Sequence, residues 1–220
     1  MSKNGFLLVA IFYATYLVTI ILGLNYLNPF LKPLLLPALI GLVYFSNYKK
    51  DRTLLLLALF FSTLGDIFLL SSKEIFFILG LGSFLTAHVL YIFIFKRAQK
   101  SIAPMVVNLV LLAVLVVYLG FFLNYLWPNL KEMKIPVVVY ALTISMMLWT
   151  AVNNWFSNKS KANLIVVLGA LFFVVSDSIL AIDLFHHKIE FGRFMVMSTY
   201  LAAQYFIVFG LDRKFVNHEK

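Results

Sequence analysis

Eight long apolar segments follow one another along the chain, and only short polar stretches separate them. Each is close to the ~20 residues that an α-helix needs to cross a bilayer. They cover approximately residues 6–23, 30–46, 53–70, 75–95, 103–123, 134–152, 162–183 and 191–211. None alternates apolar and polar residues as the strands of a membrane β-barrel do. The sequence therefore predicts an all-α polytopic membrane bundle of about eight transmembrane helices, with residues 1–220 forming a single integral membrane domain.

The composition favours a chain surrounded by lipid and excludes a soluble globular protein. Hydrophobic residues make up 63% of the 220 residues and charged residues 12%, and the mean hydropathy is +0.97. Such a chain has too few polar side chains to cover a water-exposed surface. The absence of cysteine excludes disulfides, thiol nucleophiles and thiolate metal ligands. We expect the lipid bilayer as the environment, and the sequence indicates no protein partner.

Lysine and arginine are divided unequally between the two sides of this layout. The side that holds both termini has twelve: Lys3, Lys49, Lys50, Arg52, Lys96, Arg97, Lys100, Lys159, Lys161, Arg213, Lys214 and Lys220. The other side has six: Lys32, Lys73, Lys131, Lys134, Lys188 and Arg193. The positive-inside rule then predicts cytoplasmic termini, and we expect a bacterial inner membrane. We interpret the net charge of +9 as a topology signal, and no nucleic-acid-binding face is predicted.

Two aspartates lie inside these apolar segments. Asp66 follows Leu64-Gly65 near the end of the third segment, and Asp177 follows Val175-Ser176 in the seventh. An ionisable group within a span costs about 2.5–3.5 kcal/mol even on the lenient insertion scale, so such residues usually mark a functional site. Helical rise places both about 6–9 Å below the outer boundary of the membrane. We therefore predict one catalytic pair, Asp66 and Asp177, with a structural ion pair or interhelical hydrogen bonds as the alternative.

Six further side chains are candidates for binding a substrate or supporting the aspartates. They are Lys32, His88, Tyr91, Tyr140, Tyr200 and Gln204. Lys32 begins the second segment on the outer side, where its ammonium group either reaches a carboxylate or extends to the interface. His88 lies near mid-depth, and a buried structural histidine explains it as well as a catalytic one. The tyrosines and Gln204 fit either a site or hydrogen bonding between helices.

The two halves of the chain show weak similarity to each other. Residues 84–97 align with residues 200–213, and Gly65-Asp66 then falls on Ser176-Asp177. We interpret this as a parallel 4+4 internal repeat, with halves 1–100 and 101–220, related by an axis along the membrane normal. Such an axis would bring Asp66 and Asp177 to the same depth in one cavity.

The sequence lacks the residues for most other hydrolytic chemistry. His186, His187 and His218 fall in loops or the tail, so a three-histidine zinc site is not predicted. Neither a Gly-x-Ser-x-Gly elbow nor a His-Glu-x-x-His motif is present. We expect no metal and no cofactor. Paired carboxyl groups remain, of which one can hold a proton near neutral pH while the other stays ionised.

At these residues the chain resembles a known family. The similarity rests on Lys32-Pro33, the block Gly65-Asp66-Ile-Phe-Leu-Leu70, Phe84-x-x-x-His88-x-x-Tyr91, Ser176-Asp177-Ser-Ile-Leu-Ala181 and Tyr200-Leu-Ala-Ala-Gln204. In order and spacing, over about residues 10–212, these motifs look like the YhhN-like lysoplasmalogenase family of multi-span membrane proteins. The resemblance implies an ether-bond hydrolase that acts on lysophospholipids, converting a lysoplasmalogen to a fatty aldehyde and glycerophospho-ethanolamine or -choline. It also implies that Asp66 and Asp177 are catalytic.

Two other classes of protein fit the same sequence features. A small-molecule or proton-coupled transporter would also have an even number of spans, parallel repeats and intramembrane carboxylates. A lipid-binding or scaffold protein would use the buried charges only to specify packing. Release of aldehyde from a lysoplasmalogen distinguishes the enzyme from both.

The charge distribution makes a testable prediction about topology. Reporter fusions or single-cysteine labels at the two ends of the chain should both report a cytoplasmic location. Ends on opposite faces of the membrane would contradict both the even number of spans and the parallel repeat.

Overall fold

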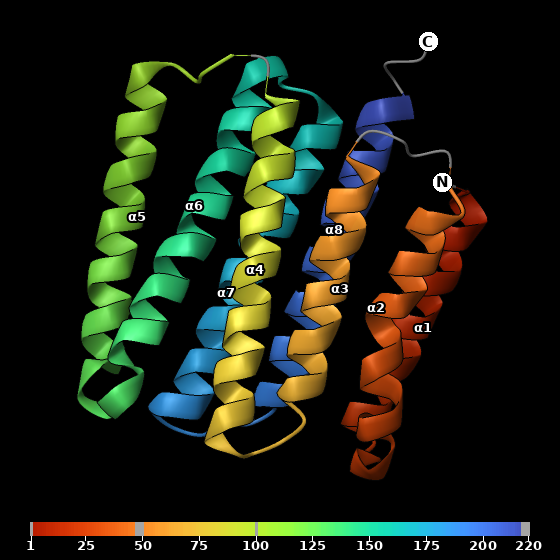
Figure 1. Ribbon diagram of the computed structural model, residues 1–220, viewed down its shortest axis with the longest axis vertical. Coiled ribbons are helices and arrows are strands. Elements are labelled where there is room, and N and C mark those ends of the chain that lie inside the picture. The colour runs from red at the N-terminus through yellow and green to blue at the C-terminus, as the bar shows by residue number, and fades with distance from the viewer. Residues whose placement is uncertain (1, 47–50, 100, 217–220) are drawn as a thin grey trace.

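The computed structural model describes residues 2–46, 51–99 and 101–216, and eight α-helices account for most of them (Figure 1). The helices are α1 (Lys3–Ile21), α2 (Asn28–Tyr44), α3 (Arg52–Phe68), α4 (Glu74–Ala98), α5 (Met105–Leu126), α6 (Lys134–Asn158), α7 (Lys161–Phe185) and α8 (Gly192–Val216). Three short 3-10 turns lie at Asn25–Leu27, Trp127–Asn129 and Lys131–Met133. The predicted all-α bundle of eight helices is confirmed.

Several predicted boundaries differ from those of the structure, and two of the differences concern polar residues. The third helix ends at Phe68, two residues after Asp66, and not at residue 70. The sixth continues to Asn158, although the cluster of polar residues from Asn153 onward predicted a loop. The physical reason is that these asparagines are buried and bonded inside the bundle: Asn153 Nδ2 donates to Asn108 Oδ1 at 2.9 Å. A polar residue with an internal partner does not need to leave the helix for water.

Seven helices are long and apolar enough to cross a membrane, and the chain is an integral, multi-pass membrane protein. Helix α3 is not among the seven, because it has 17 residues. It nevertheless packs between α2 and α4 and lies alongside them in Figure 1. That α3 spans the membrane stays a prediction, and so does the 4+4 repeat.

The helices run up and down through the bundle, so that neighbours in the chain are mostly neighbours in space. The main contacts join α3 to α2 and α4, α4 to α6, α6 to α7, and α7 to α8. Helices α1 and α2 lie at one edge and α5 at the opposite edge (Figure 1). Large buried side chains between the central helices include Leu59, Tyr91, Phe95 and Phe173.

The start of α1 and the end of α8 lie at the same end of the bundle (Figure 1). The helix bounds place the described lysines and arginines of the larger predicted group at that end, and those of the smaller group at the other. Lys49, Lys50, Lys100 and Lys220 of the larger group lie outside the described residues. The even number of helices is thus confirmed, while the membrane face at which the termini lie stays a prediction.

Glycines allow α7 and α8 to approach each other closely. A Cβ atom added at Gly169 would lie 2.9 Å from the carbonyl oxygen of Ala203 and 2.9 Å from the nitrogen of Ile207. One added at Gly210 would lie 2.8 Å from the carbonyl oxygen of Ala162. Backbone atoms cannot rotate away as a side chain can. Small residues are the usual means of close helix packing in lipid, and here they hold α7 against α8.

Gly169→Ala should therefore destabilise the protein by about 1–3 kcal/mol, since the added methyl group forces α7 and α8 apart. The measurement is thermal unfolding of purified protein in detergent. Gly120→Ala on α5 is the matched control, because nothing lies within 4 Å of its added Cβ. Equal melting temperatures for the two variants would contradict the close approach.

Candidate active site

A large chamber with many polar residues opens among α1, α2, α3, α4, α7 and α8, at the end of the bundle opposite the start of α1 and the end of α8. Its volume is about 550 Å³. Both predicted carboxylates line it, Asp66 from α3 and Asp177 from α7. Its polar wall also includes Tyr16, Asn28, Lys32, Ser176, Asp183, Lys188, Arg193 and Tyr200. The fold thus brings the two aspartates to one water-accessible space within a membrane protein.

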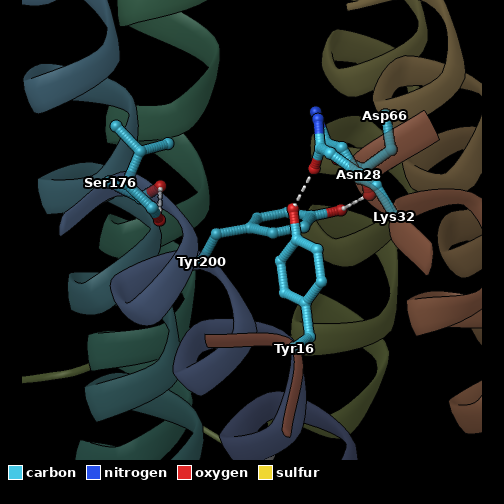
Figure 2. Close-up of polar contacts among 7 residues, drawn as sticks. Tyr16, Asn28, Lys32, Asp66, Ser176 and Tyr200 are labelled. Atoms are coloured by element: carbon cyan, nitrogen blue, oxygen red, sulfur yellow. Dashed lines mark hydrogen bonds and ion pairs between the residues drawn. The ribbon is translucent and has the colours of Figure 1, made fainter. Parts of the chain in front are cut away.

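Asp66 is almost completely buried, with 2% of its surface exposed, and it is held by two donors. The phenol of Tyr200 on α8 donates to Oδ2 at 2.7 Å, and the ammonium of Lys32 on α2 lies 3.4 Å from Oδ1. Figure 2 shows Tyr200 reaching across from α8 to Asp66, with Lys32 beside the carboxylate. A cation and a hydroxyl donor together stabilise an ionised carboxylate. Lys32 therefore faces a carboxylate and does not extend to the interface.

Asp177 has a different environment. Its Oδ2 accepts a hydrogen bond of 2.5 Å from the phenol of Tyr140 on α6. Among the residues that the structure describes, no lysine or arginine forms an ion pair with it. The neighbouring Ser176 turns its hydroxyl to the carbonyl of Val196 at 3.0 Å, which fixes α7 against α8 next to the chamber (Figure 2). Asp177 therefore lacks the cation that Asp66 has.

Four of the predicted site residues do not line the chamber: Tyr140, which bonds to Asp177 from behind, Tyr91, Gln204 and His88. The phenol of Tyr91 donates to Oε1 of Gln204 at 2.6 Å, and Nε2 of Gln204 donates to Ser62 at 3.0 Å. These buried hydrogen bonds join α4, α8 and α3. On α8, Gln204 lies one turn away from Tyr200. His88 is fully buried between the rings of Tyr140 and Phe173, at centroid distances of 5.2 and 4.6 Å. Their contacts indicate that these residues support the site from behind.

The structure adds residues that the sequence did not single out. Tyr16 on α1 donates to Asn28 at 2.5 Å beside Lys32, and Arg193 at the start of α8 donates to Asn25 at 2.6 Å (Figure 2 shows the first pair). The sequence did contain one signal for Arg193: it is a lone arginine at the predicted outer end of the eighth segment. Nothing in the sequence connected the first helix to the aspartates. The part of the chain that the structure describes contains no group of three or more His, Asp or Glu that would hold a metal ion.

Comparison with known proteins gives one matching family and several curated relatives. The model of the YhhN family matches residues 27–211. Lysoplasmalogenase TMEM86B of Rattus norvegicus is 34% identical over 149 residues, which are 67% of this chain and 56% of that protein. Lysoplasmalogenase TMEM86A of Bos taurus is 32% identical over 165 residues, 71% of this chain and 64% of that protein. Lysoplasmalogenase of Mycobacterium tuberculosis (strain CDC 1551 / Oshkosh) is 29% identical over 164 residues, with shares of 73% and 61%.

The chain therefore spans less than two thirds of the length of these relatives. No solved structure matches it.

The hydrogen bonds of Gln204 predict the cost of losing it. Gln204→Leu leaves the phenol of Tyr91 and the hydroxyl of Ser62 without this partner in the core, which should destabilise the protein by about 1–3 kcal/mol. Tyr91→Phe removes one hydroxyl only and should cost less. Thermal unfolding of both variants in detergent provides the comparison. A larger loss of stability for Tyr91→Phe than for Gln204→Leu would show that Gln204 does not hold these hydrogen-bonded residues together.

Proposed function

Because the chain belongs to the YhhN family, we propose that it is a membrane hydrolase that cleaves the vinyl ether bond of lysoplasmalogen-type lysophospholipids. The products are a fatty aldehyde and glycerophosphoethanolamine or glycerophosphocholine. The observation that carries the proposal is the shared chamber of Asp66 and Asp177. The relatives named lysoplasmalogenase support the same reaction.

The surroundings of the two carboxyl groups assign them different roles. Asp66 accepts from Lys32 and Tyr200, and this pair of donors keeps it ionised. Asp177 has a single phenolic donor, Tyr140, and lies in a wall that is largely apolar, so it is the carboxyl group that holds a proton. Asp177 is then the general acid, and Asp66 is the anion that faces the developing positive charge.

The reaction follows from these roles. Asp177 transfers its proton to the β-carbon of the vinyl ether, and the α-carbon becomes an oxocarbenium ion that the charge of Asp66 stabilises. Water adds to the α-carbon and loses a proton to the carboxylate of Asp177, which restores the acid. The hemiacetal then collapses: its hydroxyl loses a proton to form the aldehyde carbonyl, the bond between the α-carbon and the glycerol oxygen breaks, and that oxygen takes up a proton. The hydrogen from water ends on carbon 2 of the aldehyde and on the glycerol hydroxyl.

Cations at the mouth of the chamber suit the phosphate of the headgroup. Lys188 and Arg193 both line the chamber, and both are exposed. Lys188 forms an ion pair with Asp183 at 2.9 Å, whereas the hydrogen bond of Arg193 goes to the neutral Asn25. A guanidinium group with free donors binds phosphate well. We assign the phosphate to Arg193, with Lys32 deeper in the chamber as a shared contact of phosphate and Asp66.

The location of the chamber agrees with a lipid substrate that enters from the outer leaflet. The chamber lies at the end of the bundle away from both termini, and that end has the smaller group of basic residues. We accordingly place the termini in the cytoplasm and the protein in a bacterial inner membrane.

Purified protein should release aldehyde from a lysoplasmalogen, and Asp66→Asn and Asp177→Asn should each lower turnover at least about a hundredfold. Asparagine keeps the shape but cannot exchange a proton or supply a charge. Because the two residues act on one reaction, the double variant should be hardly worse than either single variant. Circular dichroism and gel filtration of the variants verify that they fold and insert.

Wild-type turnover in either aspartate variant would rule out the paired mechanism. Binding of lysolipid without any release of aldehyde would instead support a carrier or a scaffold.

Lys32 and Arg193 should differ in the kinetic parameter that they affect. Arg193→Met removes a contact present in both ground and transition states, so it should mainly raise KM. Lys32→Met also removes the cation beside Asp66, so it should lower kcat as well. Steady-state kinetics with a vinyl ether lysolipid measures both. If Lys32→Met changes KM alone, its ion pair with Asp66 has no part in the chemistry.

A further inference from the structure

Asp177 lies between two cavities of opposite character. Besides the polar chamber, it lines a narrower cavity of about 60 Å³ among α4, α5, α6 and α7. We call this second space the chain pocket, and its walls include Leu81, Phe122, Ala141, Ile144 and Ala181. Leu69, Phe77, Phe84, Leu180, Leu184 and Phe185 border both spaces together with Asp177. The two cavities therefore meet at the proposed general acid.

The walls of the chain pocket offer almost no free polar group. Its polar side chains are Tyr118, Tyr140, Asp177 and Ser178. The hydroxyls of Tyr118 and Ser178 bond to each other at 2.7 Å, and Tyr140 donates to Asp177. The remaining wall is hydrocarbon, and burying a polar ligand group there without a partner costs free energy. Only an apolar ligand fits this space.

A lysoplasmalogen has the same division into a polar and an apolar part. Its vinyl ether joins a charged glycerophospho-headgroup to a long hydrocarbon chain. When the vinyl carbons lie at Asp177, the headgroup extends toward Arg193 and Lys32, and the chain must extend the other way. The chain pocket is the apolar space that begins at Asp177.

We propose that the chain pocket holds the first methylene groups of the alkenyl chain and thereby places the vinyl carbons against Asp177. This inference rests on the proposed function and adds to it the location of the hydrocarbon. The outer wall of the pocket is α5, which packs mainly on α6 and α7 and lies at the edge of the bundle (Figure 1). The opposite side of α5 is exposed, for example at Leu109 and Val116. The rest of a long alkenyl chain therefore has only to pass α5 to reach the lipid.

Filling the pocket should change selectivity for the chain. Ala141→Leu adds three carbons to the wall without changing a polar group, and alanine and leucine have similar helix propensity. We expect kcat/KM for a hexadecenyl lysolipid to fall about tenfold or more, since one or two methylenes in an apolar pocket carry that much discrimination. A propenyl analogue with the same headgroup ends before the filled region, so its kcat/KM should stay within about twofold.

Ala113→Leu is the matched control, because Ala113 lies on the exposed side of α5 and does not line the pocket. It should leave the kcat/KM of both substrates unchanged. In Ala141→Leu, an unchanged ratio of the kcat/KM values for the two substrates would overturn the proposal, whether both values stay the same or both fall equally.

A binding measurement keeps the chain pocket testable if the protein hydrolyses no vinyl ether. Phe122 lines the pocket, and its neighbour Phe121, about 100° further round α5, is 77% exposed and does not line the pocket. The ligand is a 1-O-alkyl lysophospholipid, which has no vinyl bond to cleave. It carries bromine on chain carbons close to the ether, but not on the carbon bonded to the ether oxygen, where bromide would be lost by hydrolysis. With the protein in nanodiscs, the brominated lipid should quench the fluorescence of the tryptophan introduced by Phe122→Trp, and the quenching should saturate. It should quench the tryptophan introduced by Phe121→Trp only weakly, in proportion to the lipid concentration.

Saturable quenching at residue 122 in a protein without hydrolytic activity would reject the proposed reaction while supporting a chain site. Equal quenching at the two positions, or a failure to saturate at residue 122, would overturn the chain pocket whatever the activity.

Discussion

The ion pair between Lys32 and Asp66 is the interaction on which the rest of the site depends. Both side chains are largely withdrawn from solvent, with 12% and 4% of their surfaces exposed. A charge in such a place is stable only when an opposite charge and hydrogen bonds compensate it, and removing one partner of a buried pair costs about 3–5 kcal/mol. The pair and the phenol of Tyr200 hold α2, α3 and α8 around one carboxylate.

Asp66 and Asp177 are chemically identical side chains, but their surroundings differ. Asp66 has a cation and a hydroxyl, while Asp177 has one phenol and a wall of hydrocarbon. The difference comes from their neighbours and not from depth alone. In the proposed mechanism a vinyl ether requires both a proton donor and an anion, and the two carboxyl groups on α7 and α3 divide these tasks. The gradient from the basic mouth to the apolar pocket matches the proposed substrate from headgroup to alkenyl chain.

Much of this was predictable from the sequence, because the bilayer restricts what an apolar segment can do. Segment length predicted eight helices, and the cost of a buried charge singled out Asp66 and Asp177. Lys32 was a candidate from its position at the start of the second segment. Sequence reasoning failed for features that depend on tertiary contacts. The buried Asn153 bonds to Asn108, and α6 continues through a stretch that was predicted to be a loop. Tyr16 lines the chamber because of the packing of α1, which no local sequence pattern encodes. Tyr91 and Gln204 were recognised as polar, but only the fold shows that they bond to each other.

The most direct test of the mechanism is the fate of solvent hydrogen during hydrolysis. If Asp177 protonates the β-carbon, reaction in D₂O with immediate borohydride trapping should give a fatty alcohol with one deuterium at carbon 2. Asp177→Asn should form no such product under the same conditions. Aldehyde that forms without deuterium at carbon 2, or labelled aldehyde at the wild-type rate from the Asp177→Asn variant, would contradict the assignment of Asp177 as the acid.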